Sequence, residues 1–217
     1  MGEWWGCLPS QSDGFTNVWS VSTTFVPGVD VKRVCVFCGS SKGRQDRYAE
    51  AARAFGKELS RRNLGLVYGG GNIGLMSVVA ETVLAHKGEV IGVIPRFMVE
   101  KELARDDLTE LHVVSSMHER KALMADLSDG FVAMPGGFGT LEELCEMLTW
   151  LQLHLHRKPC GLLNVGGFFD KLVEFFDHQV QEEFVTEHNR TLIFEGKTIE
   201  SVLDQLVQGE NTLAISS

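Results

Sequence analysis

Two glycine-rich segments, each lying between an apolar strand-like run and a helical pattern, place the strongest constraint on how this chain can fold. They occupy residues 69–74 (Gly-Gly-Gly-Asn-Ile-Gly) and 135–140 (Pro-Gly-Gly-Phe-Gly-Thr). Glycine lets backbone N–H groups approach a phosphate without an intervening side chain, and the positive end of the helix dipole attracts the negative charge. The sequence therefore predicts two anion-binding helix N-termini and a phosphorylated ligand.

Apolar runs and helical patterns alternate along the chain from residue 32 onward. We expect strands at residues 34–37, 65–68, 90–94, 111–114, 130–134 and 161–163. We expect helices at residues 46–62, 75–87, 117–127, 141–156, 168–183 and 199–207. Because short apolar runs of this kind are typical of strands buried on both faces of a parallel sheet, the alternation predicts an α/β fold with a doubly wound parallel sheet. Ligands of such sheets bind at the carboxyl ends of the strands, where both glycine-rich segments fall.

Length and composition limit the size of the fold and its partners. The chain has 217 residues, of which 44% are hydrophobic, and this predicts a single well-cored domain. We assign residues 32–208 to that domain, residues 1–31 to a poorly ordered N-terminal extension and residues 209–217 to a C-terminal tail. A formal net charge of −9 argues against a nucleic-acid or anionic membrane partner, since both need a broad positive field. No apolar run approaches the length of a membrane span.

The cysteines and histidines point to neither a disulfide scaffold nor a metal site. The five cysteines are odd in number, so we expect a reducing compartment, the cytoplasm or also the nucleus. Cys35 and Cys38 form a CxxC pair inside an expected strand without a flanking ligand cluster, and we interpret them as buried thiols. His154 and His156 are two residues apart on an expected helix and cannot face one metal ion. We expect no metal and no cofactor.

Two four-residue patterns match the capping box that begins many helices. In Ser116-x-x-Glu119 and Thr140-x-x-Glu143, the glutamate carboxylate can reach back to the backbone N–H of the Ser or Thr. Spacing alone favours this structural role for Glu143 as well as for Glu119. The Arg-Lys pair after Glu119 would then lie just inside a helix N-terminus, where cations oppose the helix dipole. A bound anion would explain that placement.

Four separated segments resemble one known family, and they occur in the family's order. They are residues 34–41 (Val-Cys-Val-Phe-Cys-Gly-Ser-Ser), 67–76 (Val-Tyr-Gly-Gly-Gly-Asn-Ile-Gly-Leu-Met), 117–121 (Met-His-Glu-Arg-Lys) and 135–143 (Pro-Gly-Gly-Phe-Gly-Thr-Leu-Glu-Glu). The chain is similar here to the LONELY GUY family of cytokinin-activating phosphoribohydrolases, from about residue 32 to at least residue 164. The resemblance implies a Rossmann-like fold and hydrolysis of cytokinin riboside 5′-monophosphates to the free base and ribose 5-phosphate. It also implies a homodimer or larger assembly with shared active sites.

The resemblance also implies roles for individual residues. Arg120 and Glu143 match the family's catalytic pair, and with the family motif in view the catalytic reading of Glu143 is preferred to the cap. The residues that match substrate-binding positions are Glu102, Lys121, Gly136, Gly137, Phe138, Gly139, Thr140, Leu141, Glu142 and Thr149, and to these we add Gly70 and Gly71 of the first glycine-rich segment. Around Glu102 the family has Pro-Arg-Glu-Leu, whereas this chain has Glu-Lys-Glu-Leu and lacks the proline.

The expected chemistry fits these residue types. Breaking a ribosyl N-glycosidic bond builds positive charge at the anomeric carbon, and a carboxylate such as Glu143 can stabilise that charge or activate the attacking water. Arg120 can hydrogen-bond the substrate, but a guanidinium is a poor proton donor, so the general acid stays unassigned. Family members have often been labelled lysine decarboxylases, yet no lysine here stands out as a Schiff-base candidate.

Two alternative functions remain open. A general nucleoside-monophosphate nucleosidase acting on AMP or GMP would use the same phosphoribosyl contacts. A non-catalytic nucleotide or cofactor carrier could share the fold, although the presence of both Arg120 and Glu143 argues against it.

The helix expected at residues 141–156 is apolar on more than one side. Its main stripe holds Leu141, Leu144, Cys145, Leu148, Leu151 and Leu155. Met147, Trp150 and Leu153 form a second apolar set outside that stripe. Burial under a neighbouring helix and a subunit interface or pocket wall explain this second set equally well.

Overall fold

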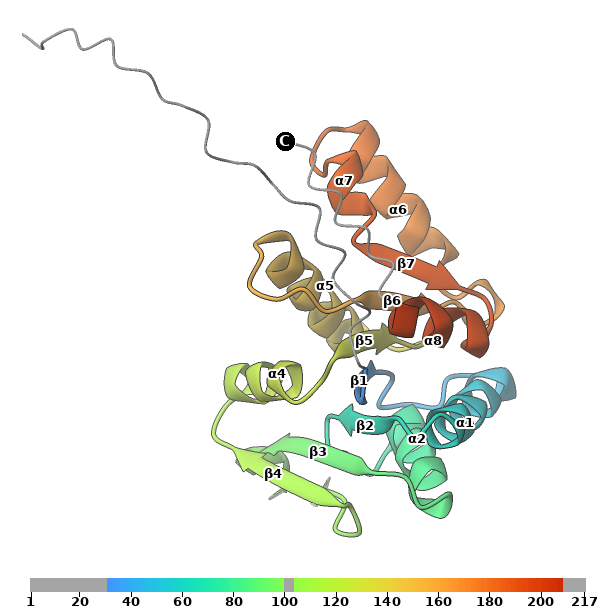
Figure 1. The fold of residues 1–217 in the computed structure, drawn as a ribbon, viewed down its shortest axis with the longest axis vertical. Coiled ribbons are helices and arrows are strands. Elements are labelled where there is room, and N and C mark those ends of the chain that lie inside the picture. The colour runs from blue at the N-terminus through green and yellow to red at the C-terminus, as the bar shows by residue number, and fades with distance from the viewer. Residues whose placement is uncertain (1–30, 100–103, 209–217) are drawn as a thin grey trace, which may run out of the picture.

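Seven parallel strands form one sheet in the order β4-β3-β2-β1-β5-β6-β7 (Figure 1). The computed structural model describes residues 31–99 and 104–208. Its strands are β1 (Arg33–Phe37), β2 (Gly65–Tyr68), β3 (Val90–Pro95), β4 (Glu110–Val114), β5 (Gly130–Ala133), β6 (Cys160–Leu163) and β7 (Ile193–Gly196). The predicted α/β fold with a doubly wound parallel sheet is confirmed.

Helices connect the strands in the expected alternation. They are α1 (Asp46–Arg61), α2 (Gly74–Ala85), α3 (Arg96–Val99), α4 (Met117–Asp126), α5 (Phe138–Gln152), α6 (Asp170–Gln181), α7 (Glu187–Arg190) and α8 (Ile199–Gln208), with a 3₁₀ turn at Val165–Gly167. The sequence did not predict the edge strand β7. Glu195 is exposed and Gly196 ends the strand, so the apolar run that marks the other strands is missing there.

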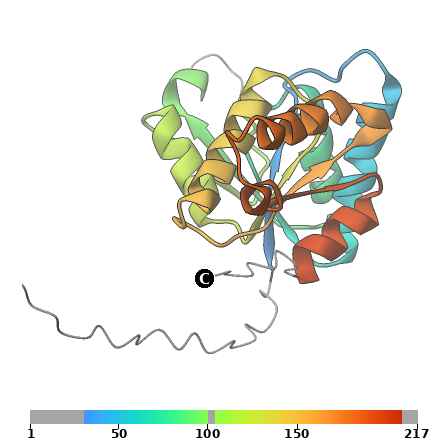
Figure 2. The ribbon, with the colours of Figure 1, turned by 90° about the horizontal axis from the view of Figure 1, so that it is seen from above.

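Alternate residues of each central strand face opposite sides of the sheet, which explains why the strands are apolar throughout. Val34 and Val36 of β1 pack on the side covered by α1, α2 and α8. Cys35 and Phe37 pack on the other side, against α4 and α5. Figures 1 and 2 show these two helical layers with the sheet between them. Cys35 and Cys38 are buried free thiols, as the sequence predicts.

The order of the strands brings three loops together at the carboxyl end of the sheet. β1 lies between β2 and β5, and the helices that follow β1 and β5 cover opposite faces, so the two loops diverge at this point. The Gly39 N–H donates to the Pro135 carbonyl at 3.0 Å, and the Leu75 N–H donates to the Gly39 carbonyl at 2.9 Å. The loops after β1, β2 and β5 therefore form one connected surface that includes both glycine-rich segments.

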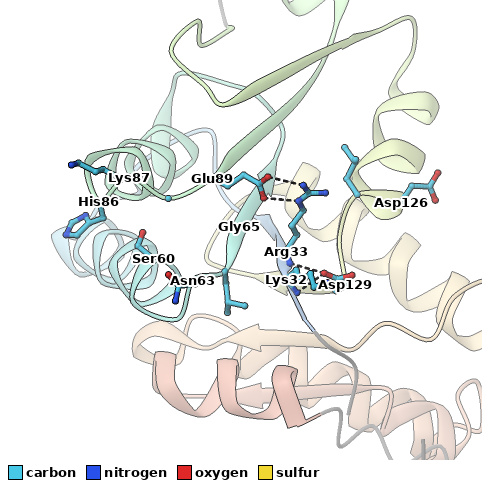
Figure 3. A pocket seen from close by; sticks show the side chains of 13 residues that line it. Lys32, Arg33, Ser60, Asn63, Gly65, His86, Lys87, Glu89, Asp126 and Asp129 are labelled. Atoms are coloured by element: carbon cyan, nitrogen blue, oxygen red, sulfur yellow. Dashed lines mark hydrogen bonds and ion pairs between the residues drawn. The ribbon is translucent and has the colours of Figure 1, made fainter. Parts of the chain in front are cut away.

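Ion pairs and a cavity mark the opposite, amino end of the sheet (Figure 3). The Asp129 carboxylate accepts hydrogen bonds from the backbone N–H groups of Lys32 and Arg33, at 2.8 and 2.9 Å. The Arg33 guanidinium donates two hydrogen bonds to Glu89. These groups line a cavity of about 640 Å³. Since its charges are of both signs and largely pair with one another, and since it lies away from the glycine-rich segments, we do not assign the phosphate site to it.

The structure describes little of the chain ends. The expected extension, except Val31, and the expected tail from residue 209 lie outside the described residues. Within residues 31–99 and 104–208, no helix has the length and apolarity needed to cross a membrane.

Candidate active site

Arg120 lies buried beneath the first glycine-rich segment. It belongs to α4 and its residue surface is only 6% exposed. Its Nε donates to the Val93 carbonyl of β3 and its Nη2 donates to the Gly69 carbonyl at the end of β2, both at 3.1 Å. Two backbone carbonyls near the ends of neighbouring strands therefore hold the guanidinium in place. Neither partner could be predicted from a sequence motif, because every residue carries a backbone carbonyl.

The contact with Arg120 explains why residue 69 must be glycine. A Cβ built on Gly69 would overlap the Nη2 of Arg120. The guanidinium thus lies directly against the peptide backbone of the turn. Any side chain at residue 69 would displace either the turn or the arginine.

Glu143 lies opposite Arg120, on the second turn of α5. Its Oε1 lies 3.9 Å from the Nη2 of Arg120, and its side chain is 12% exposed. Burial raises the pKa of Glu143 to about 7, and the neighbouring Glu142 and Glu146 carboxylates also raise it, while Arg120 and Lys121 lower it. A carboxyl group with a pKa near neutrality can both accept and donate a proton at physiological pH. The structure therefore brings together the two residues that the sequence singled out as a pair.

Lys121 joins α4 to α5 beside this pair. Its ammonium forms ion pairs with Glu142 and, at 2.8 Å, with Glu146. The lysine is 6% exposed. Its predicted role in substrate binding therefore requires the ligand to share or replace these carboxylate contacts.

The glycines of the second turn have different surroundings. A Cβ on Gly136 would overlap the hydroxyl of Thr140, so the packing of the turn itself requires this glycine. A Cβ on Gly137 or Gly139 would meet no protein atom within 4 Å. Phe138 between them is 93% exposed. The fold leaves the backbone of residues 137–139 bare and accessible at the N-terminus of α5.

Part of the capping box expected at α4 is present, whereas the one expected at α5 is not. At α4 the Ser116 hydroxyl accepts from the Glu119 N–H at 3.1 Å, and the Glu119 carboxylate accepts from the N–H of Ser115, one residue before the expected donor. At α5 the N-cap is Gly137, and the helix begins at Phe138 rather than at residue 141. Thr140 therefore lies within the helix, and the capping-box reading of Glu143 is wrong.

The remaining candidate residues lie around this centre or beyond it. Gly70 has a left-handed backbone with φ of 69°, and Gly71 pairs with Ala104 in an isolated antiparallel bridge.

Two further candidate residues lie on α5. Leu141 packs partly against the core beneath this helix. Thr149 is exposed and lies six residues beyond Glu143, about 9 Å along the helix axis. Glu102 lies outside the described residues.

The second apolar set on α5 is only partly exposed. Met147 is 1% exposed and belongs to the core, so the interface reading is wrong for this residue. Trp150 packs partly against the same core, whereas Leu153 is 59% exposed.

The main apolar stripe expected on this helix also needs correction, because Cys145 is exposed and Leu155 lies beyond the end of the helix, 68% exposed. The helix ends at Gln152, and His154 adopts a left-handed φ of 59°.

Metal ligands do not gather at this site. Within the part of the chain that the structure describes, no group of three or more His, Cys, Asp or Glu side chains is placed to hold a metal ion. The groups that lie together at this site are the buried carboxyl of Glu143, the guanidinium of Arg120 and the exposed backbone of residues 137–139.

Sequence comparisons identify close relatives. A family model described as "Possible lysine decarboxylase" matches residues 76–206. The chain is 49% identical over 175 residues to the cytokinin riboside 5′-monophosphate phosphoribohydrolase LOG of Oryza sativa subsp. japonica, covering 81% of this chain and 72% of that protein. It is 48% identical over 174 residues to the cytokinin riboside 5′-monophosphate phosphoribohydrolase LOG4 of Arabidopsis thaliana, covering 80% of this chain and 81% of that protein.

Solved structures with the same fold include more distant proteins. A molybdenum cofactor carrier protein from Chlamydomonas reinhardtii matches with a TM-score of 0.61 and 20% identity, over 81% of this chain and 96% of that chain. A molybdenum cofactor binding protein from Rippkaea orientalis matches with a TM-score of 0.59 and 20% identity, over 80% and 93% of the two chains. These two matches establish the fold.

The raised pKa of Glu143 predicts a pH-dependent stability difference in Glu143→Gln. Because the folded protein favours the protonated carboxyl, Glu143 stabilises the fold fully below the ordinary pKa of 4.5. This stabilisation is lost as pH rises through about 7. The glutamine does not titrate. As pH rises from about 4.5, the variant should therefore gain stability relative to the unsubstituted protein, by up to about 3 kcal/mol at pH 8. Urea unfolding at pH 5 and pH 8 measures the difference, with Glu174→Gln on the exposed face of α6 as control. An equal difference at both pH values would contradict the raised pKa.

Proposed function

Because the chain belongs to the family of the cytokinin riboside 5′-monophosphate phosphoribohydrolases, we propose that it hydrolyses the N-glycosidic bond of these nucleotides and releases the free cytokinin base and ribose 5-phosphate. The observation that carries this proposal is the buried pair of Arg120 and Glu143 beside the bare backbone of residues 137–139. Glu143 supplies negative charge for the reacting carbon, Arg120 helps to keep that carboxylate ionised, and the backbone supplies donors for a phosphate.

Glu143 is the proposed catalytic carboxylate. As the bond between the anomeric carbon and the base nitrogen breaks, its electron pair goes to the base, and the sugar acquires positive charge that the ionised carboxylate stabilises. The oxygen of a water molecule then bonds to the anomeric carbon. The water loses one proton as it attacks, and the departing base takes up one proton, so the protons balance. A carboxyl group with a pKa of about 7 is suited to receive and return it.

Arg120 is the proposed electrostatic partner. Its Nε and one Nη2 hydrogen are engaged by the Val93 and Gly69 carbonyls, which keeps the positive charge at a fixed place beside Glu143. A preorganised charge of this kind needs no rearrangement during the reaction. Its role is to keep part of the Glu143 population ionised and to bind substrate oxygen or nitrogen atoms.

The ribose phosphate is proposed to bind the backbone amides at the N-terminus of α5, with the first glycine-rich turn nearby. The open space at Gly137 and Gly139 supports this assignment, because nothing in the protein's own packing requires glycine there. The other proposed substrate-binding residues follow from the family resemblance, except Gly70 and Gly71, which are proposed because they belong to the first glycine-rich segment. They are Glu102, Lys121, Gly136, Phe138, Thr140, Leu141, Glu142, Thr149, Gly70 and Gly71.

The proposed assembly is a homodimer, or a larger homo-oligomer, in which two subunits share each active site. Support comes from the high exposure of Phe138 and Leu153 at the two ends of α5. The distance of Thr149 from Glu143 along α5 also supports it, since a residue so placed can more easily serve the site of a partner. The described cysteines are free thiols, which agrees with a proposed cytoplasmic location.

The phosphate assignment predicts that the nucleotide is cleaved and the riboside is not. Isopentenyladenosine monophosphate should release its base at a rate at least about 100-fold above that of isopentenyladenosine, because binding of the phosphate fixes the sugar against Glu143. Chromatography of the free base measures both rates. Equal rates would contradict the assignment, and faster release of adenine from AMP would favour a general nucleoside-monophosphate nucleosidase instead.

A matched pair of glycine variants tests the same contact. Gly139→Ala should keep or raise the melting temperature, because its Cβ meets open space and alanine favours a helix, while the KM for the nucleotide rises. Gly136→Ala should lower the melting temperature, because its Cβ overlaps Thr140. An unchanged KM in Gly139→Ala would argue against phosphate binding at this turn.

Glu143→Gln should reduce turnover by at least about 1,000-fold, since loss of a catalytic carboxylate removes several kcal/mol of transition-state stabilisation. Glu142→Gln is the matched control, because it changes the neighbouring carboxylate, which is 53% exposed. Its effect should be much smaller. Steady-state kinetics with one nucleotide decides between them, and a Glu143→Gln enzyme with near-normal turnover would exclude the catalytic role.

The shared-site proposal predicts that Leu153→Glu weakens assembly and activity together. A charge placed in an apolar contact must lose its hydration, whereas the same change on a free surface has little effect on the fold. Sedimentation velocity and turnover should be measured over the same range of protein concentration. Phe175→Glu on α6, where Phe175 is 53% exposed, is the control. A fully active monomer of the unsubstituted protein would refute the shared site.

A further inference from the structure

Arg105 holds the outer side of the turn that contacts Arg120. Its backbone N–H donates to the Gly70 carbonyl at 3.2 Å, next to the bridge between Gly71 and Ala104. The turn at residues 69–72 is therefore fixed from two directions. Arg120 binds it from beneath through Gly69, and the segment at 104–105 binds it from the side.

The side chain of Arg105 extends this attachment to the tip of the turn. Its Nη1 donates to the Asn72 side-chain carbonyl at 3.3 Å and to Glu81 of α2 at 3.1 Å. Its Nε and Nη2 donate to both carboxylate oxygens of Asp107, at 2.5 and 2.8 Å. The side chain is 12% exposed. All three guanidinium nitrogens thus have partners.

The partners of Arg105 are themselves connected. The Ser77 hydroxyl on α2 lies 2.6 Å from Glu81 and 3.2 Å from Asn72, and it donates to the closer Glu81 carboxylate. The hydrogen bond from Arg105 lowers the pKa of Asp107, so this carboxylate stays charged and paired. The network joins α2, the turn after β2 and the segment before β4.

We infer that Arg105 is a positioning residue of the active site, which acts through the turn at residues 69–72 to set the place of the Arg120 guanidinium relative to Glu143. The inference rests on the proposed function for the identity of the reaction. It assigns Arg105 no contact with substrate. The planar fork of arginine suits this task, because a lysine ammonium cannot reach Asn72, Glu81 and Asp107 in one plane.

The chain offers a matched control in Arg62. This arginine also pairs with two carboxylates, Glu58 and Asp204, and its side chain is 18% exposed. It caps the C-terminus of α1 and precedes β2, whereas the turn at residues 69–72 follows β2 at the opposite end of that strand. Arg62→Met therefore removes a comparable ion-pair network without touching the turn.

The test compares Arg105→Met, Arg105→Lys and Arg62→Met with cytokinin nucleotide as substrate. Arg105→Met should lower kcat by about tenfold or more with a smaller change in KM, because a misplaced charge slows the chemical step. Arg105→Lys should recover only part of kcat. Arg62→Met should keep kcat within about twofold even where its melting temperature falls. Unchanged kcat in Arg105→Met, or an equal loss in Arg62→Met, would overturn the inference.

Hydrogen exchange separates this inference from the proposed function. The backbone amides of residues 70–72 should exchange faster in Arg105→Met and at the normal rate in Arg62→Met. If the unsubstituted protein released no base from any nucleotide, the proposed function would fail, and the exchange result would still decide whether Arg105 orders the turn. Unchanged exchange at residues 70–72 would overturn the inference whatever the activity.

Discussion

The burial of one positive charge, that of Arg120, organises the carboxyl end of this sheet. A guanidinium removed from water needs hydrogen-bond acceptors, and removing one partner of a buried charge costs roughly 3–5 kcal/mol. The acceptors here are the Gly69 and Val93 carbonyls, with Glu143 as the opposite charge. This requirement explains the absence of a side chain at residue 69 and the position of α4 over the ends of β2 and β3. The carboxylate that balances the charge comes from α5.

Much of the fold could be predicted from the sequence, because five of the strands are apolar runs that the parallel sheet buries on both faces, and the edge strand β4 still carries Leu111, Val113 and Val114. The edge strand β7 could not, since an exposed glutamate interrupts the pattern there. For the site, the motifs indicated Arg120 and Glu143 but not their surroundings. The acceptors of Arg120 are backbone carbonyls, which every residue carries, and Arg105 lies outside every recognised motif. The start of α5 was misplaced by three residues because the Thr140 capping pattern is common and Gly137 is the actual N-cap.

The comparisons separate what the fold determines from what its residues determine. Proteins named as molybdenum cofactor carriers share this fold with TM-scores near 0.6 at 20% identity. A doubly wound sheet offers a binding crevice to many ligands, so its presence selects no reaction. The phosphoribohydrolase relatives, at 48 and 49% identity, carry the functional argument together with the Arg120–Glu143 geometry.

The central place of β1 has a consequence for the synthesis of the chain. β1 is made first, yet it needs β5 as its second neighbour, and the Asp129 carboxylate that binds the start of β1 lies 97 residues after Lys32. One edge of β1 therefore stays unpaired until more than half of the chain has emerged from the ribosome. Parallel pairing over such separations is slow, and an open strand edge invites association with other chains. Nascent chains that stall before residue 130 should thus be natural targets for chaperones.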